Sequence, residues 1–499
     1  MNLRVSSQPP GPPQQLLLPL PGIAIEPAPS GIPRTERVFV NRNLRMSTID
    51  WVGFDMDYTL AIYKQEQMDA LSIELTADRM VKRGYPTYLK QLRYDTRFPI
   101  RGLLIDKRYG HILKMDRHKV VHNGYHGARR LTREELLELY HHRRIRPHTP
   151  RYHWIDTLFS LSEVTAFAAV VEALEKKGES VDYDKLFSDV RAAIDEAHAD
   201  GTVYRIVTGD LPRFVERDPE LARTLHKLRS AGKKLFLLTN SPWTYTNTLL
   251  SFLLGDAMPE YPSWRHYFDV AICSAMKPLW FREGRPLMER EGDVLRAVKA
   301  PLERGRLYEG GNLREFERLA GLMGSAVLYV GDHIYGDILR SKKESAWRTA
   351  MIIQELDAEL AAHHACAEDF GRQRQLEDAR DKLEDELRFY QGRFKDLARG
   401  PGAETLPAQA EKLRVKRALE RVRGALRSIE REYEVLDERI DKRFHPYWGS
   451  LLKEHTEMSM FGLQVEMYAD IYTRRVSCLQ HYSPQQFFRS PHDLMPHEL

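Results

Sequence analysis

Three short runs of apolar residues, at 51–54, 234–238 and 327–330, are each followed at once by polar residues. Continuous apolar strands that alternate with helical patterns are typical of a parallel sheet covered by helices on both faces. In such sheets, ligands bind beyond the carboxyl ends of the strands. We therefore expect the polar residues that follow the three runs to meet in one crevice.

About 180 residues separate the first of these strands from the second, whereas a simple crossover needs roughly a dozen. The pattern predicts an α/β core made of residues 34–65 and 205–360, interrupted by an inserted cap at 66–204. Within the cap, residues 184–199 have the pattern of a helix. The basic, histidine-rich stretch 128–151 is expected to be a solvated loop.

Residues 370–445 are predicted to form two long helices. In the second, apolar residues recur at alternating spacings of three and four, which is a heptad seam: Leu419, Val422, Leu426, Ile429, Tyr433, Leu436 and Ile440. The first has nearly the same pattern: Leu383, Leu387, Tyr390, Phe394 and Leu397. Gly400-Pro401-Gly402 breaks the chain between them. An antiparallel hairpin is expected, packed on its own core or on another subunit.

The remaining segments and the composition exclude several classes of protein. Residues 1–33, rich in Pro, Gln and Ser, are predicted to be a flexible tail, and residues 446–499 to pack on the core. With 75 basic and 71 acidic side chains, the charge is too balanced for a typical nucleic-acid-binding protein. No run approaches the roughly 20 apolar residues of a membrane helix. Three scattered cysteines favour a reducing, cytoplasmic location.

The strongest chemical signal is Asp55-Met56-Asp57, directly after the first strand. Phosphoryl transfer needs a nucleophile in line with the phosphorus and a proton donor for the leaving oxygen. Asp55 suits the first role, by forming an aspartyl-phosphate, and Asp57 suits the second. Taken alone, the pair is equally consistent with a turn in which aspartates are common, so the interpretation depends on the other strand ends.

Polar groups after the second strand and beyond it supply what a phosphate needs. Thr239, Asn240 and Ser241 offer hydroxyl and amide donors, and Lys277 offers a positive charge. A single lysine is usually a surface residue and means little by itself. Together with the aspartates, however, these donors predict a phosphate-binding site in which Thr239 and Lys277 also assist catalysis.

Carboxylates after a further strand predict a metal site. A phosphate ester and Asp55 repel each other, so a hard divalent cation is needed between them. Oxygen ligands of this kind favour Mg²⁺. The expected ligands are Asp55, the backbone carbonyl of Asp57 and Asp332, with Asp337 in the layer behind them.

These elements, in this order, match the four motifs of the haloacid dehalogenase superfamily, and longer stretches resemble the cytosolic purine 5′-nucleotidases within it. The stretches that carry the resemblance are Arg37–Arg42, Phe54–Tyr63, Phe98–Leu103, Val330–Leu339 and Leu494–Glu498. The resemblance runs from roughly residue 36 to the C-terminus. It implies a haloacid dehalogenase-like Rossmannoid core, hydrolysis of the nucleoside monophosphates IMP and GMP, phosphoryl transfer to nucleosides, and a homo-oligomer.

The resemblance also implies which residues recognise the base. Arg191, Asp195 and His198 are spaced by four and three, which places them on one helix face. By resemblance, Arg191 and Asp195 hydrogen-bond the purine edge, His198 belongs to the same site, and Phe159 stacks on the base. Without it, they would be an exposed ion pair, a solvated histidine and a core phenylalanine. Tyr204 stands where animal enzymes have a lysine, which leaves the base preference open.

Two other functions fit the same sequence. One is a phosphatase of the same superfamily for another metabolite, such as a pyrimidine nucleotide or a sugar phosphate. The other is a nucleotide-binding scaffold with a vestigial site, for which the helical hairpin would be the partner surface. The intact charged residues disfavour the scaffold, because converging charges that serve no chemistry cost stability.

Overall fold

The computed structural model describes residues 31–141, 145–292, 294–298, 301–399 and 405–491. The chain divides into two units, Met1–Pro33 and Arg34–Leu499. Most of the predicted tail, the Gly400-Pro401-Gly402 break and the Leu494–Glu498 motif lie outside the described residues. The fold described below is that of the second unit.

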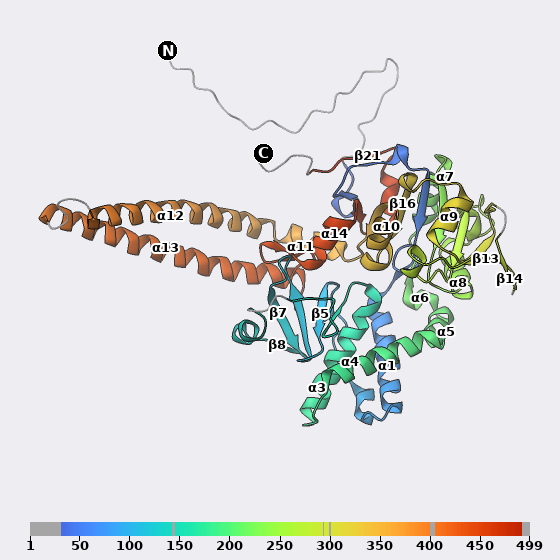
Figure 1. The fold of residues 1–499 in the computed structure, drawn as a ribbon, viewed down its shortest axis with the longest axis horizontal. Coiled ribbons are helices and arrows are strands. Elements are labelled where there is room, and N and C mark those ends of the chain that lie inside the picture. Colours follow the sequence, from blue (N-terminus) through green and yellow to red (C-terminus); the bar gives the residue numbers. More distant parts are fainter. Residues whose placement is uncertain (1–30, 142–144, 293, 299–300, 400–404, 492–499) are drawn as a thin grey trace, which may run out of the picture. The chain divides into compact units, whose positions relative to one another are not determined.

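A ten-stranded mixed sheet forms the core of this unit (Figure 1). The strands from β20 to β15 are parallel, and antiparallel strands border them at both edges. In spatial order the strands are β1 (Phe39–Val40), β20 (Ile471–Thr473), β17 (Arg348–Ile352), β16 (Val327–Gly331), β3 (Trp51–Phe54), β11 (Lys234–Leu238), β12 (Val270–Cys273), β15 (Leu307–Gly310), β13 (Leu287–Glu291) and β14 (Val294–Ala297). The three strands expected from the sequence are therefore confirmed, and they are neighbours.

Alternate residues of these strands enter two hydrophobic cores, one on each face of the sheet. Val52 and Leu237 belong to one core, whereas Trp51 and Phe236 belong to the other. The helices around the sheet are α7 (Leu221–Ser230), α8 (Trp243–Leu254), α9 (Leu313–Ala320), α10 (Arg340–Glu344), α11 (Leu356–Ala365) and α14 (Met460–Tyr468). Gly53 is required in β3, since a Cβ there would lie 2.0 Å from the Phe236 ring.

The inserted segment contains a second sheet of five antiparallel strands, which the sequence did not reveal. In order these are β8 (Arg129–Arg130), β7 (Val121–His126), β6 (His111–Met115), β5 (Leu103–Asp106) and β9 (Tyr152–Trp154). Three longer helices accompany it: α1 (Gln65–Lys82), α3 (Leu161–Lys176) and α4 (Tyr183–Ala199). The helix expected at 184–199 is thus confirmed.

The expectation of a solvated loop at 128–151 is wrong. This stretch contains β8, the short helix α2 (Arg133–Leu136) and a π-helical turn at Leu137–His141. Leu131 and Tyr140 are buried in a small core of their own. The basic residues dominate the composition, but the apolar residues between them are what fold the segment.

The predicted helical hairpin is present as α12 (Ala367–Arg399) and α13 (Leu406–Phe444), which lie side by side (Figure 1). Asp369 pairs with Arg439, and Arg372 pairs with Glu432 at 2.6 Å, so the two helices are antiparallel. The heptad residues named above are buried or half-buried. Among the described residues, no helix has the length and apolar character that crossing a membrane requires.

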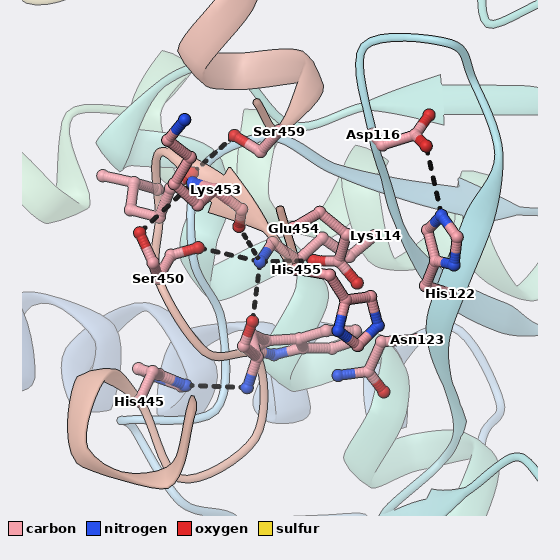
Figure 2. A network of polar contacts seen from close by, with 12 residues as sticks. Lys114, Asp116, His122, Asn123, His445, Ser450, Lys453, Glu454, His455 and Ser459 are labelled. Carbon is pink, nitrogen blue, oxygen red and sulfur yellow. Dashed lines mark hydrogen bonds and ion pairs between the residues drawn. The ribbon is translucent and has the colours of Figure 1, made fainter. Parts of the chain in front are cut away.

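A buried lysine joins the inserted sheet to the segment that follows the hairpin (Figure 2). The side chain of Lys114, on β6, is 3% exposed, and its ammonium lies 2.5 Å from Glu454. The same nitrogen donates to the backbone carbonyls of Trp448, Ser450 and Lys453 at 2.7–2.8 Å. All of the lysine's hydrogen-bonding capacity is therefore used to hold one loop.

Replacing this lysine should destabilise the protein strongly. Lys114→Met leaves Glu454 buried without a counter-charge, and such a change costs about 3–5 kcal/mol in free energy of unfolding. Lys107→Met is the matched control, because its partner Asp184 is 67% exposed and exposed pairs contribute about 1 kcal/mol or less. Urea unfolding measures both. A Lys114→Met protein as stable as the control would contradict this account, and Lys114→Met/Glu454→Leu should recover part of the loss.

Candidate active site

The register of the central strands brings the predicted catalytic residues to one edge of the sheet. Phe54 at the end of β3 is level with Val330 of β16 and Leu237 of β11. The residues that follow these strand ends are therefore neighbours, although they lie up to about 280 residues apart in the chain. Asp55 and Asp332 are both buried there.

Lys277, in the loop after β12, is the centre of this group. Its ammonium lies 2.8 Å from Asp55 Oδ1 and 2.6 Å from Asp337 Oδ1, and it donates to the hydroxyl of Tyr329 at 3.0 Å. Burial opposes the charged form, but Asp337 and Asp55 raise the pKa of Lys277 well above its usual value. The lysine is thus a fixed positive charge between two carboxylates.

Asn240 holds the backbone of that lysine. Its side-chain amide donates to the Lys277 carbonyl at 2.9 Å, and its side-chain oxygen accepts the Lys277 backbone N–H at 2.6 Å. The sequence suggested a phosphate donor at this position. The geometry gives the Asn240 side chain another partner, and it positions the lysine.

Asp55 has one oxygen occupied and one available. Oδ1 accepts the backbone N–H of Met56 at 2.7 Å and the ion pair from Lys277. Oδ2 takes part in neither contact. Burial raises the pKa of Asp55 well above its usual value, Lys277 acts against this, and the neighbouring aspartates raise it further.

Asp57 is held at both oxygens by hydroxyl groups. Tyr63 donates to Oδ1 and Ser241 donates to Oδ2, each at 2.6 Å. The Tyr63 hydroxyl also lies 2.7 Å from that of Tyr245. Burial raises the pKa of Asp57, and the hydrogen bonds from Ser241 and Tyr63 act against that rise.

The sequence analysis missed the two tyrosines and gave Ser241 a different partner. Tyr63 belongs to a stretch that carries the family resemblance, and this was the one signal that singled it out. Tyr245 had none, because its place depends on how α8 packs. The aromatic ring of Tyr204 lies 4.6 Å from that of Tyr245, so the residue that departs from the animal pattern joins the same cluster.

Three buried carboxylates could hold a cation. Oxygen atoms of Asp55, Asp332 and Asp337 lie within 4.8 Å of one another. Asp332 Oδ2 is buried and has no hydrogen-bond partner among the described residues. Burial, and then Asp337, raise the pKa of Asp332 to about 7. An all-oxygen group with an unpaired acceptor fits a hard divalent cation such as Mg²⁺.

These carboxylates differ in how their oxygens are already engaged. Asp337 Oδ1 already contacts the ammonium of Lys277 and the hydroxyl of Tyr329. Asp55 and Asp332 have an oxygen left for a direct bond to a cation. Asp337 Oδ2 accepts the backbone N–H of His333 at 3.4 Å, and the place of Asp337 behind the ligands stays a prediction.

Arg101 fixes the loop that carries Asp332. It is 1% exposed and makes two hydrogen bonds to the carboxylate of Glu355, at 2.8 and 2.5 Å. It also donates to the backbone carbonyl of Asp332 at 2.8 Å. Sequence reasoning gave this arginine no role, since its partners lie more than 200 residues away.

The residues expected to recognise a base are only partly brought together. Phe159 is 40% exposed, and its ring centre lies 6.2 Å from that of His198. Arg191 instead contacts His153 at 3.1 Å, and its Nε lies 3.9 Å from the carboxylate of Asp195. The side chains of Arg191 and Asp195 are largely exposed, so the structure does not join them to Phe159.

Comparison with known proteins defines the class. The model of the 5′ nucleotidase family matches residues 38–499. A 5′-nucleotidase domain-containing protein from Dictyostelium discoideum is 30% identical over 476 residues, which are 92% of this chain and 74% of that protein. The chain belongs to the 5′ nucleotidase family. It is a phosphoric monoester hydrolase.

Solved structures are similar at lower levels of identity. A predicted phosphoglycolate phosphatase from Haemophilus somnus 129pt is 14% identical, with a TM-score of 0.27, over 62% of this chain and 86% of that one. A HAD-hydrolase from Bacillus subtilis bound to magnesium is 12% identical, with a TM-score of 0.22, over 61% of this chain and 86% of that one.

Proposed function

We propose that this enzyme is a magnesium-dependent 5′-nucleotidase that hydrolyses IMP and GMP through an aspartyl-phosphate on Asp55. One observation carries the proposal: Lys277 binds Oδ1 of Asp55, beside two further buried carboxylates. This arrangement leaves the other oxygen of a buried aspartate outside both contacts, and Lys277 offsets part of the negative charge of Asp55. Nucleophilic catalysis on a phosphate monoester needs both features.

Asp55 Oδ2 would attack the phosphorus, while the bond between phosphorus and the 5′ oxygen of the nucleoside breaks. Because Met56 N–H and Lys277 both hold Oδ1, the other oxygen is oriented as the nucleophile. The leaving oxygen takes a proton from Asp57. Burial favours the protonated form of Asp57 before the reaction, which suits a general acid.

The second half of the reaction reverses these roles. Asp57, now a carboxylate, removes a proton from water as the water attacks the phosphorus. The bond between Asp55 and phosphorus then breaks, which releases phosphate and restores the carboxylate of Asp55. The hydroxyls of Tyr63 and Ser241 hold Asp57 in place throughout. A nucleoside hydroxyl in place of the water would give phosphotransfer.

Thr239 is suited to bind the phosphate. Its Oγ1 is buried and accepts the backbone N–H of Ser241 at 3.1 Å. The hydrogen of the hydroxyl is therefore left to donate to a phosphate oxygen. Lys277 supplies the positive charge on the same side.

The carboxylates of Asp55 and Asp332, with the backbone carbonyl of Asp57, would hold Mg²⁺. When bound, the ion offsets the negative charge that the substrate adds to this group. The unpaired Oδ2 of Asp332 supports this assignment. Mg²⁺ would also favour the ionised form of Asp55, against the effect of burial.

The purine preference is supported by Phe159 and His198, whose rings lie together near the catalytic loop. Phe159 packs edge-on against Tyr58, with ring centres 4.7 Å apart, and Tyr58 directly follows Asp57. We keep Arg191 and Asp195 as proposed contacts to the base edge. Movement of their exposed side chains on substrate binding would be required.

Location and assembly belong to the same proposal. We expect a cytoplasmic enzyme, which the three free, buried cysteines support. We also expect a homo-oligomer. Phe389 and Val435 on the helical hairpin are both 67% exposed, which offers apolar surface for a second copy. Sedimentation velocity tests this expectation, and finding only a monomer would contradict it.

Phosphate release should depend on magnesium and on the purine base. With Mg²⁺, we expect release from IMP and GMP to exceed that from AMP, CMP, UMP and a sugar phosphate, and EDTA to abolish it. Asp55→Asn should lower kcat by about 10³-fold or more, because the nucleophile is lost. Asp50→Asn, an exposed aspartate just before the same strand, is the matched control.

Each alternative predicts a different result in that assay. Equal or faster release from non-purine substrates would preserve the mechanism and rule out the base assignments. An absence of release from every substrate would favour the vestigial scaffold.

Tyr63→Phe should lower kcat with little change in KM. Removing the hydroxyl frees one oxygen of Asp57, so proton transfer to the leaving group suffers, by roughly tenfold. Tyr245→Phe is the control, because Tyr245 contacts Tyr63 and not Asp57. The loss of kcat in Tyr63→Phe should be smaller with p-nitrophenyl phosphate as the substrate, because its leaving group needs no proton. The same deficit with both substrates would show that Tyr63 does not act through Asp57.

A further inference from the structure

A small cavity lies beside the catalytic loop. The rings of Tyr58, Phe159 and His198 form part of its wall, and its volume is about 20 Å³. A space of this size holds one water-sized group. A purine ring does not fit, but a single substituent on the edge of the ring does.

A buried carboxyl that the mechanism does not use lines this cavity. Asp69, on α1, is 2% exposed. Its Oδ1 accepts a hydrogen bond from Gln65 Nε2 at 2.9 Å. Its Oδ2 is buried and has no partner in the part of the chain that the structure describes. Buried polar atoms are rarely left unpaired, because burial without a partner costs free energy.

The two serines at the cavity are already hydrogen-bonded. Ser72 Oγ donates to Ser162 Oγ at 3.0 Å, and Ser162 Oγ donates to the backbone carbonyl of Phe159 at 3.3 Å. The Gln65 amide nitrogen is used on Asp69. Oδ2 of Asp69 remains as an unpaired carboxyl oxygen of a cavity-lining residue, and Gln65 Oε1 is a second unpaired oxygen beside it, in the part of the chain that the structure describes.

The environment of Asp69 determines whether Oδ2 donates or accepts. No cation forms an ion pair with it among the described side chains, and burial raises its pKa to about 8. The titratable groups that face it are Tyr58 and Tyr94, whose pKa burial raises, and His198, whose pKa burial lowers. All three are neutral at pH 7, so none of them holds Asp69 in the ionised form.

A protonated Asp69 has one donor to offer. Because Oδ1 accepts the Gln65 N–H and Oδ2 has no partner among the described residues, the proton is assigned to Oδ2 of this cavity-lining residue. The complementary partner is a hydrogen-bond acceptor about the size of one oxygen atom. Among nucleobase substituents, a carbonyl oxygen meets both conditions, whereas an amino group presents hydrogens to the same donor.

We propose that Asp69 is a specificity-determining residue of the base site, which donates a hydrogen bond from Oδ2 to the 6-carbonyl oxygen of a 6-oxopurine beside Phe159 and His198. The inference rests on the purine 5′-nucleotidase function proposed above. AMP carries a 6-amino group and would set two donors against each other. A site built around a hydrogen bond discriminates strongly against a ligand that cannot form it.

The test is the ratio of kcat/KM for IMP to that for AMP, in the full-length enzyme. Asp69→Leu removes the donor and should lower this ratio about tenfold or more. Asp69→Asn keeps a donor, because Gln65 binds the amide oxygen and turns the amide nitrogen toward the cavity, so the ratio should stay within about threefold. Asp78→Asn is the matched control on α1, since Asp78 pairs at the surface with Lys90.

The dependence of this ratio on pH is an independent test that needs no loss-of-structure control. In the wild-type enzyme the ratio should fall as pH rises from 7 to 9, because the ionised carboxylate no longer donates. In the Asp69→Asn enzyme the ratio should not fall over this pH range. Ionisation of the base itself affects both enzymes equally and cancels in the comparison.

Two results would overturn the inference. One is an equal loss of activity on IMP and AMP in Asp69→Leu, which would mean that the carboxyl is structural. The other is the same pH dependence in the wild-type and Asp69→Asn enzymes. Failure of the wild-type enzyme to hydrolyse IMP would instead refute the proposed function, and this outcome is read before any variant is compared.

Discussion

The concentration of negative charge at the end of β3 is the constraint on which the rest of the site depends. Asp55, Asp332 and Asp337 are buried within a few ångströms of one another, and three carboxylates in that setting repel one another strongly. Among the residues that the structure describes, Lys277 is the one ammonium that contacts two of them. The surrounding contacts, from Asn240 on the lysine backbone to Tyr329 on its ammonium, keep this charge in place.

The repulsion among these carboxylates also explains why the site suits a cation and a phosphate. A group of carboxylates that is only partly neutralised favours a divalent cation, and the cation together with Lys277 favours an anion. Binding a cation would therefore offset negative charge that Lys277 alone leaves uncompensated. The hydroxyl groups around Asp57 serve a different purpose, since they orient an acid without adding charge.

The sequence predicted the parts of the site that directly follow strands. Asp55, Thr239 and Asp332 were found because apolar runs mark strand ends, and strand ends share one edge of a sheet. Lys277 lies in a loop with no periodic signal, so it was found through the order of the motifs. The pairing of Tyr63 and Ser241 on Asp57, and of Arg101 with Glu355, arises from tertiary packing between distant segments. Residue patterns carry no information about such contacts.

Among the larger elements too, some were predicted from the sequence and others were not. The α/β core and the helical hairpin have strong periodicity and were predicted, whereas the five-stranded sheet of the insert was not. One reason is that its strands carry buried polar residues such as Lys114, which interrupt the apolar pattern. Another is that 128–151 looked like a solvated loop, because its many charges masked the few apolar residues that pack.

The buried contacts of Arg101 bear on how a substrate reaches the site. This arginine belongs to the inserted segment, yet its guanidinium is sealed against Glu355 and the backbone of Asp332. Swinging the whole insert away would expose these partners and break three hydrogen bonds, while Lys114 anchors the insert at a second point. A hinged opening of the whole insert would therefore cost the contacts of both Arg101 and Lys114, whereas rotation of the exposed Phe159 ring would cost none of them.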